Sequence, residues 1–174
     1  MKNKVIFSII GFICTNLLFS QNLLTNGNFE SGGVGVGFNT NGTGYVQIFS
    51  PFSGSTSPGN FAITTNPQPM NTTFFIAGGD HTSGTGNMLV IDGNATGGQQ
   101  RFWEAGNSGS GVSGLTIGTT YTFSYWVKSV STTVVDNATR ADIGIQIDNA
   151  SSVTLLSGAA LAPLPAAGWQ RVSY

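Results

Sequence analysis

The chain has 174 residues, enough for one domain with a proper core and too few for two comfortable ones. Hydrophobic residues make up 40% and aromatic residues 11%, so the low charged fraction of 7% does not signal a disordered chain. From residue 21 onward the sequence holds four basic and seven acidic residues, and this net charge of −3 argues against nucleic acid as a partner.

The first twenty residues predict a secretory signal peptide. Lys2 and Lys4 precede an apolar run of 15 residues, Val5 to Phe19, which is shorter than the ~20 residues of a membrane span. We expect cleavage near Ser20, which would export the mature chain without a membrane span. An N-terminal membrane anchor is the alternative. Cys14, the single cysteine, leaves with the signal, so the mature chain must fold without disulfides.

Short alternating segments separated by turn residues predict strands in the first half of the mature chain. An Asn-Gly turn signal lies within 22–30, and 31–44 is a glycine-rich loop. Strands are expected at 45–49 and 87–91, and the segment 99–104 follows. Four prolines between 50 and 73 predict a long surface loop with at most a short strand at 61–64.

The second half contains the clearest strand, YTFSYWVK at 121–128. A second alternating segment, ADIGIQID, lies at 141–148, and a proline-containing stretch then leads to a last strand that begins at Trp169. No segment has helical periodicity, so we expect an all-β, antiparallel β-sandwich or jelly roll spanning 21–174. Because the last strand stops soon after it begins, we expect a C-terminally incomplete module with further domains of the same polypeptide.

Four motifs occur in a familiar order: NLLTNGNFESG, GLTIGTTYTFSYWVKS, ADIGIQID and GWQRVSY. Together they resemble galactose-binding-like, jelly-roll carbohydrate-binding modules of the cellulose- and xylan-binding type, as found in secreted Bacteroidetes proteins. The resemblance covers residues 22–174. It implies a non-catalytic module that tethers a secreted or cell-surface protein to polysaccharide. The family's later strands are absent here, and the 50–73 loop is longer than the family's usual connection.

The resemblance also implies a structural calcium ion near the opening motif. Glu30 is the acidic residue of that motif, and a carboxylate among glycine and asparagine backbone carbonyls suits the oxygen coordination of Ca²⁺. The alternative is a solvated carboxylate in a turn.

Trp126 is the first candidate for sugar binding. Strand alternation in 121–128 places it opposite Tyr121, Phe123 and Tyr125, so it lies on the outer face if those three pack inward. An exposed indole can stack on the apolar face of a pyranose, while polar side chains bind the hydroxyls. The alternative is that a loop or another domain covers Trp126.

The predicted polar contacts of this site come from Lys128, Asp142 and Gln146. Phe102 and Trp103 alternate, so one of them faces outward, and Trp103 is a second candidate platform. Trp169 is expected to pack structurally.

The stretch GGDHTSGTGNMLVIDG contains the single histidine, His81, beside Asp80. Glycine and serine on both sides indicate a turn that leads into a strand, with the Asp80 carboxylate bonded to backbone N–H groups. His81 then contacts a ligand through hydrogen bonds rather than as a base. No second histidine or nucleophile motif accompanies it, so no enzyme activity is expected.

The sequence is also compatible with a second function, that of a structural or adhesion module of a large type IX-secreted surface protein, without sugar binding. An open face around Trp126 favours sugar binding. A face covered by the 50–73 loop favours the structural role.

Overall fold

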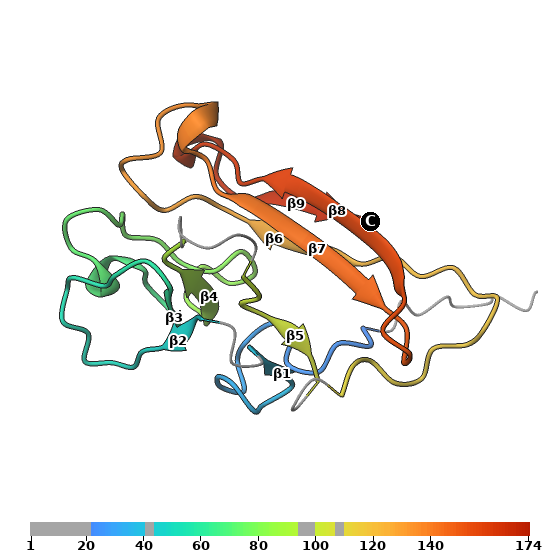
Figure 1. Ribbon diagram of the computed structural model, residues 1–174. Coiled ribbons are helices and arrows are strands. Elements are labelled where there is room, and N and C mark those ends of the chain that lie inside the picture. The colour runs from blue at the N-terminus through green and yellow to red at the C-terminus, as the bar shows by residue number, and fades with distance from the viewer. Residues whose placement is uncertain (1–21, 41–43, 94–99, 107–109) are drawn as a thin grey trace, which may run out of the picture.

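The computed structural model describes residues 22–40, 44–93, 100–106 and 110–174, and it confirms an all-β fold (Figure 1). The predicted signal peptide and Cys14 lie outside these residues. The strands are β1 (Phe38–Asn39), β2 (Val46–Gln47), β3 (Asn60–Thr64), β4 (Met88–Ile91), β5 (Glu104–Ala105), β6 (Ser124–Val127), β7 (Asp142–Asp148), β8 (Thr154–Leu161) and β9 (Gln170–Ser173).

Helical structure in the described ranges is limited to short 3₁₀ turns: η1 (Gln68–Met70), η3 (Asn137–Thr139) and η4 (Pro165–Ala167). None of these turns approaches the length and apolar character of a membrane-crossing helix.

The first half of the chain forms two small sheets, at the lower left and lower centre of Figure 1. In one, β3 pairs antiparallel with β4 and parallel with β2. In the other, β1 pairs antiparallel with β5. The strands expected near 45–49, 61–64 and 87–91 are therefore confirmed, although the first shrinks to two residues.

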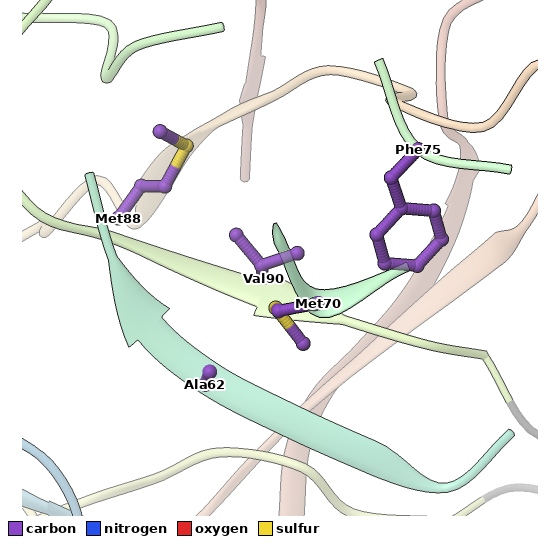
Figure 2. Close-up of a cluster of buried hydrophobic side chains, with 5 residues drawn as sticks. All are labelled: Ala62, Met70, Phe75, Met88 and Val90. Atoms are coloured by element: carbon purple, nitrogen blue, oxygen red, sulfur yellow. The ribbon is translucent and has the colours of Figure 1, made fainter. Parts of the chain in front are cut away.

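The hydrophobic core gathers over β3 and β4. Figure 2 shows its five buried members, Ala62, Met70, Phe75, Met88 and Val90, which are at most 7% exposed. Ile48, Phe52, Val130 and Trp169 pack against this cluster. Trp169 therefore has the structural role expected from the sequence, and it links the core to the strand that follows it.

The segment 50–73 was predicted to be a surface loop, but part of it belongs to the core. Met70 is fully buried, and Pro67 at the start of η1 is also nearly inaccessible. Backbone hydrogen bonds from Thr56 to Met70 and from Thr72 to Gly54 hold the two arms of the segment together. Strand β3 is the regularly paired part of this segment, and side-chain burial fixes the path of the chain after it.

The second half of the chain forms two antiparallel ribbons, β6–β9 and β7–β8. One face of β7–β8 is half-buried, and it carries three isoleucines of β7 and Gly158 of β8. A Cβ on Gly158 would lie 2.5 Å from the Tyr174 ring. The Tyr174 ring in turn stacks on that of Tyr125 of β6. The two ribbons therefore face each other across an aromatic layer, in the upper part of Figure 1.

Two elements differ from the sequence-based expectation. The strand predicted at 121–128 is shorter, because the Tyr121 hydroxyl accepts a hydrogen bond from the Thr116 N–H at 2.8 Å and holds this end in a local loop. Strand β8 was missed, because its sequence TLLSGAAL has weak β-propensity and no clear alternation. Backbone hydrogen bonds to β7 stabilise this strand, although its local sequence does not favour one.

Candidate functional site

The candidate site lies on the face of the β6–β9 ribbon that is turned away from the aromatic layer. Trp126 lies directly opposite Arg171 in the antiparallel register, and Ser124 lies opposite Ser173. The next positions on the same face are Lys128 and Trp169, because side chains alternate along each strand. We call this set the Trp126 face: Ser124, Trp126, Lys128, Trp169, Arg171 and Ser173.

The inner face of the same ribbon confirms that Trp126 points away from the aromatic layer. Phe123 contacts Tyr125 with ring centroids 6.0 Å apart, and Tyr125 contacts Tyr174 at 6.5 Å. Trp126 itself is 45% exposed. The alternation in the sequence therefore assigned Phe123, Tyr125 and Trp126 to the correct sides of the strand. Tyr121, which was expected to pack inward with them, is instead 43% exposed and lies before the start of β6.

His81 lies against Trp126, although 45 positions separate them in the sequence. The two rings are stacked, with centroids 3.6 Å apart and an interplanar angle of 16°. His81 also meets Trp169 edge to face at 6.2 Å. One side of the Trp126 indole is thus occupied by a residue of the chain, and the covering segment is 78–86 rather than the 50–73 loop.

Asp80 gives the loop that carries His81 a defined shape. Its carboxylate accepts hydrogen bonds from the backbone N–H groups of Thr82, Ser83 and Gly86 and from the Ser83 hydroxyl, at 2.7–2.8 Å. These bonds, led by that from the Ser83 N–H, hold the pKa of Asp80 well below its usual range. Asp80 is therefore a structural anchor of the loop, as the turn interpretation predicted.

Two further contacts fix the loop on the molecule. Glu30 Oε1 accepts a hydrogen bond from the Asn87 N–H at 2.8 Å, across 57 positions of sequence. On the other side, the Lys128 ammonium lies 3.3 Å from the position that a Cβ on Gly78 would take. The opening segment therefore binds the end of the loop, and the Lys128 side chain, just after β6, lies beside its start.

Glu30, the predicted calcium ligand, accepts a hydrogen bond from the Asn87 N–H through one oxygen. The carboxylate keeps further lone pairs for a cation. In the described ranges, no group of three or more His, Cys, Asp or Glu side chains is placed to hold a metal ion. Ligands besides Glu30 would have to be mainly backbone carbonyls, and calcium at Glu30 stays a prediction.

The remaining predicted site residues do not join Trp126. Trp103 contacts Phe123 at 6.2 Å, so it belongs to the aromatic layer on the inner side of the ribbon. Asp142 and Gln146 lie on the exposed face of β7, whose opposite face meets Tyr174. Both residues therefore lie outside the Trp126 face, although the Asp142 charge acts on Tyr125 from the inner side of the β6–β9 ribbon.

Arg171 was not among the predicted site residues, although it is the direct cross-strand partner of Trp126. The sequence could have indicated Arg171 only if 121–128 and 169–174 were paired in the correct register, because that pairing places Arg171 beside Trp126. Comparisons with protein-family models, with curated proteins and with solved structures found no match for this chain.

Proposed function

We propose that this chain is a non-catalytic carbohydrate-binding module of the jelly-roll type, which tethers a secreted or cell-surface bacterial protein to polysaccharide. The proposal rests on the environment of Trp126, whose indole is 45% exposed but is held in place by the stacked His81 ring. A platform that is already oriented loses little conformational freedom when a sugar binds. The apolar face of a pyranose can then stack on the accessible part of the indole.

Polar groups around this platform support the same role. Arg171 lies beside Trp126 and donates a hydrogen bond to the Ser124 hydroxyl at 3.0 Å, so one edge of the indole is lined by hydrogen-bonding groups. Sugar hydroxyls need such donors and acceptors at the rim of an aromatic platform. His81, itself exposed, covers one face of the indole and brings a polar ring next to the platform.

Affinity gel electrophoresis of the whole chain tests this proposal, with soluble β-glucan, xylan and galactan as ligands. The matched variants are Trp126→Ala and Phe49→Ala, because Phe49 is 70% exposed and lies outside the Trp126 face. We expect retardation of the wild type and of Phe49→Ala by at least one polysaccharide. Trp126→Ala should bind about 30-fold more weakly, which corresponds to the loss of one hot-spot side chain of about 2 kcal/mol.

Two outcomes would contradict the proposal at different levels. If no polysaccharide retards the wild type, the sugar-binding function is wrong. If Trp126→Ala and Phe49→Ala bind equally well, sugar binding stands but its site lies elsewhere.

A structural or adhesion module is the second candidate, and the His81–Trp126 stack favours it. Rings 3.6 Å apart pack as core side chains do, so the stack could serve only to fasten the 78–86 loop to β6. On that reading Trp126→Ala lowers the free energy of unfolding while glycans bind neither protein.

A further inference from the structure

The four basic residues of the described chain fall into two pairs. Arg101 forms an ion pair with Glu104 at 3.1 Å, and Arg140 donates hydrogen bonds to Asn137 and to backbone carbonyls at the end of β8. These two cations are neutralised or satisfied by groups of their own neighbourhood. They have a structural role and leave no donors directed at a ligand.

The other pair, Lys128 and Arg171, lies on the Trp126 face. Arg171 is exposed, and its one hydrogen bond to a described residue goes to the neutral Ser124 hydroxyl. Within the described ranges, no carboxylate lies within ion-pair distance of Lys128 or Arg171. Half of the cations of a chain with net charge −3 after residue 20 are therefore uncompensated on one small face.

Asp80 in the covering loop and Glu30, which binds the end of that loop, form no ion pair with Lys128 or Arg171. Both carboxylate oxygens of Asp80 accept hydrogen bonds from backbone N–H groups and a hydroxyl of its own loop. Glu30 Oε1 accepts from the Asn87 N–H. Neither acid forms an ion pair with the Trp126 face, so the indole is flanked by positive charge on its own ribbon.

We propose that the Trp126 face selects acidic polysaccharide, that is, sugars carrying a carboxylate or a sulfate. This inference rests on the proposed sugar-binding function and names its substrate class. The ring of the acidic sugar stacks on Trp126, and its anionic group accepts charge-assisted hydrogen bonds from the Arg171 guanidinium. Lys128 adds a second positive charge on the same face. Two cations suit one acidic sugar, whereas duplex DNA binding commonly draws on about six or more phosphate contacts.

Affinity gels with matched acidic and neutral polymers test the selection on the whole chain. Polygalacturonate is compared with its methyl ester, and a sulfated galactan with its desulfated form. We expect at least one acidic polymer to bind about 10- to 100-fold more tightly than its neutral partner, the range expected for one charge-assisted interaction. This preference should weaken as salt is raised from low to physiological concentration. The pair that shows it identifies carboxylate or sulfate as the anionic group.

The variants Arg171→Gln and Arg101→Gln separate the site from the overall charge. Both remove one positive charge, but Arg101 lies outside the Trp126 face. Arg171→Gln should abolish the preference for the acidic polymer, while Arg101→Gln should keep it.

Equal binding of acidic and neutral partners, or equal effects of the two variants, would overturn the selection of acidic sugars. A Trp126-dependent affinity for neutral glycan would then remain as evidence for the proposed function. If none of these polymers and none of the neutral glucans binds, the proposed function and this inference both fail.

Discussion

Met70→Ala tests whether the proline-containing segment 50–73 is part of the core. Met70 of η1 is fully buried against the face of the β3–β4 pair, and the change removes three heavy atoms from that site (Figure 2). At ~0.8 kcal/mol per buried CH₂-sized group, the transfer contribution alone is about 2.4 kcal/mol. The cavity left behind raises the expected loss into the range of about 2–5 kcal/mol.

We therefore expect Met70→Ala to lower the free energy of unfolding by about 3 kcal/mol. For a domain of this size that is a fall in Tm of about 6–12 °C. Urea and thermal unfolding followed by circular dichroism measure both quantities.

Two variants of the same segment serve as controls. Met70→Leu nearly conserves volume and should cost less than about 1.5 kcal/mol. Phe74→Ala removes a side chain that is 47% exposed and should cost about 1 kcal/mol, because only about half of the ring is buried. If Met70→Ala is no more destabilising than Phe74→Ala, the segment does not contribute to the core and the packing argument is wrong.

Three further predictions concern the loop that holds His81 and the aromatic layer. A Cβ on Gly79 would collide with the Gly84 backbone, whereas a Cβ on Gly93 would meet open space. Gly79→Ala should therefore release the His81–Trp126 stack and change the tryptophan fluorescence, while Gly93→Ala should not. Equal spectra of the two variants would contradict this expectation. Because hydrogen bonds lower the pKa of Asp80, the stability that its charge contributes is complete above about pH 4 and disappears as the pH falls through the lower folded pKa. Asp80→Asn should therefore flatten the acid limb of the stability curve, an effect that Asp148→Asn should not reproduce. Burial, helped by the Tyr174 hydroxyl and the Asp142 charge, raises the pKa of Tyr125 to about 12, so this contribution to stability is complete below about pH 10 and lost as the pH rises toward 12. A pH titration followed by tyrosinate absorbance should show a late step that Tyr125→Phe removes. It should also show an early step from Tyr121, because the Thr116 N–H lowers the pKa of that residue. If all four tyrosines ionise together, both assignments are wrong.

The sequence supported the fold class and several strand positions because these depend on local pattern. Alternation in ADIGIQID predicted β7 almost to the residue, and the isoleucines do form its half-buried face. Strand β8 escaped notice because its place depends on seven cross-strand pairs with β7, which no local propensity encodes. The same limit applies to Met70, whose burial follows from the path of a loop rather than from a periodic pattern.

Local sequence patterns predicted only part of the candidate site. Alternation is a rule about one strand, so it correctly predicted which side of β6 bears Trp126. It carried no information about the partner on that side. Arg171 lies there because of the β6–β9 register, and His81 because a loop anchored by Asp80 and Glu30 crosses the ribbon.

Asp142 and Gln146 illustrate the converse. They alternate as Trp126 does, but their ribbon is turned so that its isoleucine face meets Tyr174, and their own face points away. A binding face assembled from several strands therefore requires the register and the orientation of each ribbon as well as the alternation within it. In this chain the backbone pairing of β6 with β9 sets the register, and the aromatic layer sets the orientation of the ribbons through Tyr125, Tyr174 and the space that Gly158 leaves for the Tyr174 ring.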